Sequence, residues 1–173
     1  MEVRERTMLV HLKLSSCGFT KVDHEATDDI LEQHSAGNNA GKFTKHLLPQ
    51  EAIKPVNTIV NLIRTVSKQQ TLPFDDSHWR LLTTDNYIGY LKVINELIVK
   101  LREQVEVLVD QFGHHKERAK SMLGGMYKET DYPKPDEIRA KYKIETDFRS
   151  VPSAGNFLVS LSDEHLADIQ KRI

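Results

Sequence analysis

The chain has 173 residues, of which 39% are hydrophobic and 28% charged, and its formal net charge is −1. This length and composition predict one soluble globular domain spanning residues 1–173, and the near-neutral charge excludes a global field that recruits nucleic acid or membranes. The one cysteine, Cys17, excludes an internal disulfide and a multi-thiolate zinc site. No apolar run reaches the ~20 residues needed to cross a bilayer, and residues 1–6 lack a signal-peptide pattern, so we expect a cytoplasmic protein.

Residues 1–48 predict a strand, an acidic helix and a flexible loop. In the strand Thr7–Leu14, the residues Met8, Val10, Leu12 and Leu14 share one face, and the more polar face carries Thr7, Leu9, His11 and Lys13. On that polar face, a histidine is more easily explained as a solvated side chain than as a metal ligand. Asp23 is a suitable N-cap for a surface helix that ends near His34, and a Gly- and Asn-rich loop follows at residues 35–41.

Residues 49–123 predict a helical hairpin that forms the core. The first helix runs from Pro49 to about Gln70, with Pro55 implying a bend or a restart. The second runs from Thr84 to Phe112 and continues, after an interruption at Gly113, to about Leu123. Its apolar residues recur at steps of three and four, as expected for one helical stripe; they are Tyr87, Leu91, Ile94, Ile98, Leu101, Val105, Leu108 and Phe112.

Residues 124–173 predict a short helix at Asp136–Tyr142, a β-hairpin made by Ile144–Val151 and Phe157–Leu161, and a last helix capped by Ser162. Together these elements indicate a mainly helical α+β fold. We expect a long-helix hairpin that packs on a small antiparallel β-sheet, in which the N-terminal strand joins the C-terminal hairpin.

The connection between the two long helices contains the best-looking chemical cluster, Asp75, Asp76 and His78. Two carboxylates and an imidazole are suitable ligands for a hard divalent ion. Consecutive side chains rarely converge on one ion, however, so a capping or ion-pairing role is the better explanation. We therefore expect no metal ion and no other cofactor, and the sequence has no recognisable nucleophile signature that would indicate an enzyme.

The only tryptophan, Trp79, lies in the same connection. It could be an exposed contact for a partner or a platform on which a nucleobase stacks. The interpretation favoured by its apolar neighbours is that Trp79, Leu81 and Leu82 close the open end of the helical hairpin.

Two basic segments could contact nucleic-acid phosphates. The first lies within residues 42–46 and the second within residues 114–120, and an ordinary solvated surface explains the same residues equally well. The candidate nucleic-acid-binding residues are Lys42, Lys45, His114, His115, Lys116, Arg118 and Lys120.

Three segments resemble a family of small, mostly uncharacterised proteins encoded by tailed bacteriophages and prophages: residues 71–76 with Arg80-Leu81-Leu82, Asp131-Tyr132-Pro133, and residues 151–157. The chain differs from the family pattern at Phe74, usually a tryptophan, and at Asn156, often an aspartate. The resemblance implies a viral origin and action in the bacterial cytoplasm, but it implies no reaction. Because the matching residues lie in loops, it suggests that loops carry the function.

The sequence therefore predicts a non-enzymatic phage accessory protein that acts by binding another macromolecule, most simply a protein. Inhibition of a host or defence complex is one form that this binding could take. The protein could also self-associate through the long helix. The expected partner-binding residues are Phe74, Asp75, Asp76, Trp79 and Arg80. The alternative is a nucleic-acid-binding factor in phage replication or recombination, and a metal-dependent enzyme is the weaker third hypothesis.

Overall fold

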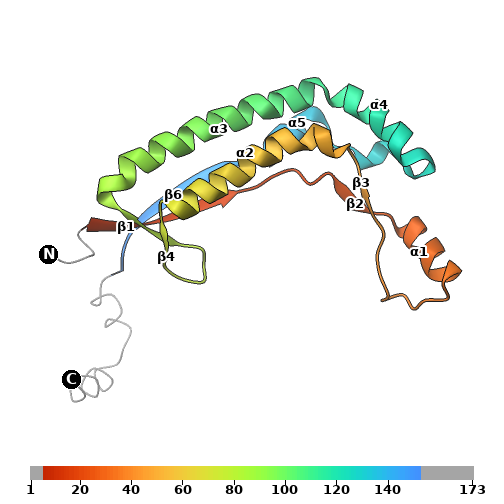
Figure 1. The fold of residues 1–173 in the computed structure, drawn as a ribbon, viewed down its shortest axis with the longest axis horizontal. Helices are drawn as coiled ribbons and strands as arrows, with labels where there is room; N and C mark the ends of the chain where they lie inside the picture. The colour runs from red at the N-terminus through yellow and green to blue at the C-terminus, as the bar shows by residue number, and fades with distance from the viewer. Residues whose placement is uncertain (1–5, 153–173) are drawn as a thin grey trace, which may run out of the picture.

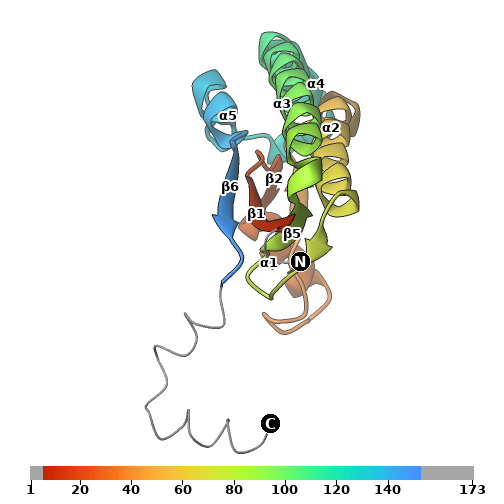
Figure 2. The ribbon, with the colours of Figure 1, turned by 90° about the vertical axis from the view of Figure 1, so that its left-hand side faces the viewer.

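The computed structural model describes residues 6–152, in which a pair of long helices covers one face of an antiparallel sheet (Figures 1 and 2). This mainly helical α+β architecture confirms the fold class expected from the sequence. In chain order the elements are β1 (Thr7–Leu14), β2 (Thr20–Val22), α1 (His24–Gln33), β3 (Thr44–His46), α2 (Gln50–Gln69), β4 (Leu72–Pro73), β5 (Arg80–Thr83), α3 (Tyr87–Asp110), α4 (Phe112–Leu123), α5 (Pro135–Lys141) and β6 (Ile144–Ser150).

Helices α2 and α3 pack side by side and form the helical hairpin that the sequence predicted. Pro55 lies within α2, which continues without a restart from Gln50 to Gln69. In the first half of α3 the buried residues are Tyr90, Ile94 and Leu97, so the core stripe is rotated relative to the prediction. The reason is that this half of α3 packs on the sheet as well as on α2, and Phe148 of β6 contacts the rings of Tyr87 and Tyr90.

The long helix is not continuous from residue 84 to residue 112, as the periodicity had suggested. A 3₁₀ turn covers Thr84–Asn86, and the chain bends at Gln111 rather than at Gly113 before α4 begins. The bend brings Phe112 into the core, where its ring lies 6.3 Å from Phe19 and 6.3 Å from Tyr132. Tertiary packing of this aromatic side chain therefore ends α3 at Asp110, before the end at Phe112 that the periodicity predicted. Among the described residues, no helix is long and apolar enough to cross a membrane.

The main sheet has the strand order β4-β5-β1-β6, and all of its neighbouring strands are antiparallel. The N-terminal strand does join the strand that begins at Ile144, as predicted. Its second neighbour is β5, which the sequence analysis had placed in a connecting segment. The predicted strand at Phe157–Leu161 and the last helix lie outside the described residues.

The two faces of β1 differ from the expected pattern at one residue, Leu9. Val10 belongs to the core under the helices, as predicted. Leu9 lies on the opposite face and is nonetheless completely buried. Across the sheet it faces Leu81 on one side and Arg149 on the other, so the outer face has a small apolar region of its own. A polar-looking strand face thus contains one residue that behaves as core.

A buried ionic cluster joins α1, the β2–β3 ribbon and the 3₁₀ turn Glu129–Asp131. The Lys45 side chain is only 2% exposed, and its ammonium lies 2.7 Å from an Asp23 carboxylate oxygen and 2.9 Å from one of Asp131. It also donates a hydrogen bond to the carbonyl oxygen of Met126 at 2.7 Å. Lys21 forms a second ion pair with Asp131 at 2.6 Å. The cluster therefore contains two cations and two anions that are mutually neutralised.

The charged forms prevail in this cluster despite its burial. Burial lowers the pKa of Lys45, but the carboxylates of Asp23 and Asp131 outweigh burial and raise it above its ordinary value. Burial raises the pKa of Asp131, but the ion pairs with Lys21 and Lys45 outweigh burial and hold this pKa below the usual range. The pKa of Asp23 is lowered by the hydrogen bond from Lys45 and by that from the Ala26 N–H. Each of the three groups therefore stabilises the fold in its charged state.

We expect Lys45→Met to destabilise the fold strongly, because it leaves two carboxylates in a buried position with one cation fewer. Removing one member of a buried ion pair costs about 3–5 kcal/mol. Chemical denaturation followed by circular dichroism measures this loss. Lys42→Met is the matched control, since Lys42 is an exposed lysine three positions earlier. Equal stability of the two variants would contradict a structural role of the cluster.

The same cluster predicts an acid-dependent stability. The folded-state pKa values of Asp23 and Asp131 are lowered, so their contribution is complete above the unfolded pKa of about 3.9 and is lost as the pH falls through the folded values. In Lys45→Met, protonation instead relieves unpaired buried charge. The difference in unfolding free energy between wild type and variant should therefore shrink between pH 7 and about pH 3. A difference that is constant over this range would contradict the assignment.

Candidate protein-binding surface

The loop between β4 and β5 is held in one shape by Asp75. One of its carboxylate oxygens accepts hydrogen bonds from the Ser77 N–H at 3.0 Å, the Ser77 hydroxyl at 2.8 Å and the Trp79 N–H at 3.3 Å. The hydroxyl bond is the main reason why the pKa of Asp75 is lowered. His78 completes the turn with a φ of 68°. Asp75 thus stabilises a turn; it caps no helix, and the arginine that it approaches is Arg149 rather than a neighbour such as Arg80.

Trp79 lies on the outer face of the sheet, where β1 and β6 each bring one side chain to its ring. The guanidinium carbon of Arg149 lies 3.8 Å from the ring centroid, and the His11 ring lies 5.3 Å away. Arg149 also approaches Asp75, with a guanidinium nitrogen 3.8 Å from a carboxylate oxygen. Trp79 therefore does not close the end of the helical hairpin. Of the three residues given that role, it is Leu82 that is buried in the core.

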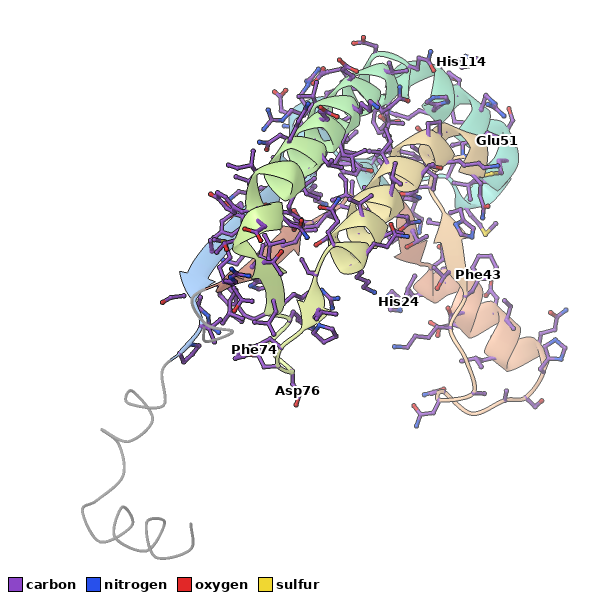
Figure 3. The ribbon with its side chains drawn as sticks, turned by 60° about the vertical axis from the view of Figure 1, so that its left-hand side comes forward. His24, Phe43, Glu51, Phe74, Asp76 and His114 are labelled. Carbon is purple, nitrogen blue, oxygen red and sulfur yellow. The ribbon has the colours of Figure 1, made fainter. Side chains whose placement is uncertain are left out.

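Exposed apolar side chains continue from Trp79 along the β-hairpin formed by β4 and β5. Leu72 is 68% exposed and Phe74 is 39% exposed. Figure 3 shows Phe74 and Asp76 at the tip of the hairpin, projecting from the end of the molecule opposite α1. Tryptophan and arginine are the residue types that most often dominate protein-binding energies. We refer to Leu72, Phe74, Trp79 and Arg149 as the hairpin surface.

Arg80, which the sequence grouped with these residues, points toward the C-terminal end of α2. Its guanidinium donates hydrogen bonds to the Thr71 hydroxyl at 2.6 Å, the Thr71 carbonyl at 2.8 Å and the Lys68 carbonyl at 3.2 Å. The Lys68 carbonyl belongs to the last turn of α2, where carbonyls have no partner within the helix, and Thr71 follows the C-cap residue Gln70. Arg80 therefore caps the C-terminal end of α2, and its side chain lies on the face of the sheet opposite to Trp79.

Asp75, Asp76 and His78 do not come together around a common point. Asp75 is occupied by the loop backbone, and Asp76 projects outward at the tip of the hairpin (Figure 3). Within residues 6–152, no group of three histidine, cysteine, aspartate or glutamate side chains could hold a metal ion.

The basic residues of α4 are largely engaged by neighbouring glutamates. Lys116 pairs with Glu129, Lys120 lies 2.7 Å from Glu117, and Arg118 lies 3.5 Å from Glu51. Lys116 and Lys120 also lie over the rings of Tyr132 and Tyr127. These contacts join α4 to the segment at residues 127–132 that closes the buried ionic cluster.

The remaining members of the predicted nucleic-acid set are divided between surface and core. Lys42 and His114 are exposed, and Figure 3 places His114 on α4, at a distance from the hairpin. Lys45 is buried in the ionic cluster and is unavailable to phosphates. His115 is also buried, and burial lowers its pKa. The structure therefore leaves no continuous basic face from these seven residues.

Sequence reasoning placed His11 on the outer face without connecting it to Trp79, and it missed Arg149. Neither has a distinctive local pattern, and only the pairing of β1 with β5 and β6 brings them to Trp79. Comparisons with family models, curated protein sequences and solved structures find no significant match to this chain.

Because Trp79 is the only tryptophan of the chain, its fluorescence reports directly on this geometry. We expect Arg149→Ala to increase quenching by acrylamide, since the guanidinium that covers the ring is removed. The loss of stability should stay below about 1 kcal/mol, the usual size of an exposed cation–π contact. Lys143→Ala is the control, as it removes an exposed cation just before the same strand. Identical quenching in both variants would contradict the stacked arrangement.

Proposed function

We propose that this protein acts by binding another protein through the hairpin surface and catalyses no reaction of its own. The single observation that supports this proposal is the arrangement of Trp79 beneath Arg149, beside the exposed apolar side chains of Leu72 and Phe74. Such a combination of an aromatic ring, an arginine and exposed apolar groups is typical of the centre of a protein interface.

The hairpin surface is also well ordered before any partner arrives. Asp75 fixes the loop through three hydrogen bonds, and the Phe74 N–H donates a hydrogen bond to the Trp79 carbonyl at 3.1 Å. A preformed surface loses less conformational entropy on binding than a flexible loop does. The Asp75 carboxylate therefore supports binding indirectly, by positioning its neighbours.

The chemistry of the hairpin surface indicates the kind of partner that it fits. Leu72 and Phe74 offer apolar area, and the partly exposed guanidinium of Arg149 can donate to an acceptor beside that area. A protein segment with an apolar side chain next to a carboxylate or a free carbonyl satisfies both. The resemblance to phage-encoded proteins suggests a target in the bacterial cytoplasm, such as a host or defence complex that is inhibited when its own binding site is covered.

The nucleic-acid alternative has less support. Lys116, Arg118 and Lys120 each face a glutamate, so phosphate binding would have to replace existing ion pairs. A metal-dependent enzyme has less support still, since Asp75 is occupied by the loop backbone.

The test is affinity capture of the tagged protein from bacterial lysates, with and without phage infection and with and without nuclease. We expect a stoichiometric protein partner that resists nuclease. Phe74→Ser should reduce its recovery at least about tenfold, since truncating a central interface residue commonly costs more than 1.4 kcal/mol. Ile88→Ser is the matched control, because Ile88 is an exposed apolar residue on α3 outside the hairpin surface.

Two results would contradict the proposal. Capture that disappears with nuclease would favour the nucleic-acid alternative. If Phe74→Ser and Ile88→Ser reduced recovery of the partner equally, the hairpin surface would not be the binding site.

A further inference from the structure

Strand β6 forms one edge of the main sheet as far as residues 6–152 are concerned. The Ser15 N–H donates to the Lys143 carbonyl at 2.9 Å, and this bond fixes the phase of the β1–β6 ladder. In an antiparallel pair, hydrogen-bonded and non-hydrogen-bonded positions alternate. The backbone groups of Glu145, Asp147 and Arg149 therefore point toward β1. Those of the alternate residues point away from it, toward the edge; they are Ile144, Thr146, Phe148 and Ser150.

A groove runs beside this edge, between β6 and α3. It has a volume of about 470 Å³, and its walls include Ile144, Thr146 and Phe148 of the strand and Leu91, Ile98 and Val99 of the helix. The residues whose backbone groups point to the edge therefore also direct their side chains toward the groove. A strand added at this position would complete the ladder of β6 and place every second side chain against α3.

We propose that the strand which occupies this edge is β6 of a second copy of the protein, in place of the segment Phe157–Leu161 that the sequence predicted to pair with it. The two β6 strands run antiparallel across a two-fold axis, so the two main sheets become one continuous sheet with α3 of each copy on the same side. Two-fold symmetric dimers, in which the same surface of both copies meets, are the commonest homo-oligomers of soluble proteins. The proposed dimer shares only Arg149 with the hairpin surface, and the oligomeric state tests it without any other partner.

In one register, charged side chains of one β6 strand face opposite charges on the β6 strand of the second copy. If the two-fold axis passes beside Asp147, all seven residues of each strand are paired, and Glu145 of each copy faces Arg149 of the other. Opposite charges that face each other across neighbouring strands stabilise the pairing. On the axis, the two Asp147 carboxylates approach each other, but each already lies 2.5 Å from its own Lys13 ammonium, just as each Glu145 carboxylate lies 2.6 Å from its own Lys143 ammonium. The register centred on Thr146 is less favourable, because it places Glu145 opposite Asp147.

The same register completes the groove. Phe148 of one copy lies opposite Thr146 of the other, and both side chains face the helices. Val99, which is 52% exposed in the described chain, is then covered by the second copy. Val107 lies on the same helix and is 46% exposed, but it does not line the groove. The proposal thus distinguishes between two similar exposed valines.

Sedimentation velocity of the full chain over micromolar to 100-micromolar concentrations tests the proposal. We expect the mass to rise toward twice the 19.9 kDa of one chain. Val99→Lys should weaken the dimer at least tenfold, whereas Val107→Lys should leave it unchanged. Thr146→Pro should also weaken it while the monomer stays folded, because the Thr146 N–H points away from β1. A constant mass of one chain would overturn the proposal, and so would equal effects of the two lysine substitutions.

A cross-link tests the register directly. Two copies of residue 147 face each other across the axis, so Asp147→Cys should form an intermolecular disulfide under mild oxidation. The natural Cys17 is buried. Glu145→Cys is the control, because its two copies lie about 13 Å apart along the paired strands at ~3.3 Å per residue. Cross-linking that is equal at the two positions, or found only at 145, would overturn this register.

Discussion

The buried ammonium of Lys45 is the interaction on which the arrangement of this molecule depends. It brings together Asp23 at the start of α1 and Asp131 in the turn before α5, two residues that are more than a hundred positions apart in the chain. A buried charge is tolerated only when it is paired and hydrogen-bonded. The three charged groups and the Met126 carbonyl therefore have one satisfactory arrangement, and it fixes α1 and the β2–β3 ribbon against the end of α4.

More exposed ion pairs surround this buried cluster. Tyr127 and Lys128 lie in the segment that ends at Asp131, and Lys128 lies 3.1 Å from Glu25 of α1. Lys116 and Lys120 of α4 contact Glu129 and Glu117. Exposed pairs of this kind each contribute little to stability. The Lys116–Glu129 pair joins α4 to the segment that ends at Asp131, whereas the Lys120–Glu117 pair lies within α4 itself.

Sequence periodicity was sufficient to predict the elements in which local pattern and packing agree. The strand at Thr7–Leu14, the helices α2 and α3 and the short helix α5 follow from alternation, apolar spacing and capping residues. The prediction was wrong where a long-range contact decides. The burial of Phe112 ends α3 early, and the pairing of β5 with β1 turns part of a connecting segment into a strand. Neither contact has a local signature.

The candidate sites were predictable to a similar extent. The sequence identified the Asp75–Trp79 loop, because the long connection between the helices contains the Asp75, Asp76 and His78 cluster and the only tryptophan. It could not find Arg149 or the burial of Leu9, since both depend on which strands become neighbours. It grouped Lys45 with exposed lysines because composition records charge but not burial. Lys45 is a structural lysine because it pairs with Asp23 and Asp131, and these residues are too far from it in the sequence for a local pattern to show the pairing.

Strand β6 links the two proposed interactions. Its outward-facing Arg149 covers Trp79, its inward-facing Phe148 packs on Tyr87 and Tyr90, and its edge is the proposed contact between copies. A two-fold axis perpendicular to the sheet leaves the outer faces on one side, so a dimer presents two hairpin surfaces in the same direction. For a partner that is itself dimeric or repetitive, two linked contacts increase the overall affinity by about 10²- to 10⁴-fold over one. A modest hairpin surface on a monomer would thereby become a strong binding surface on the dimer.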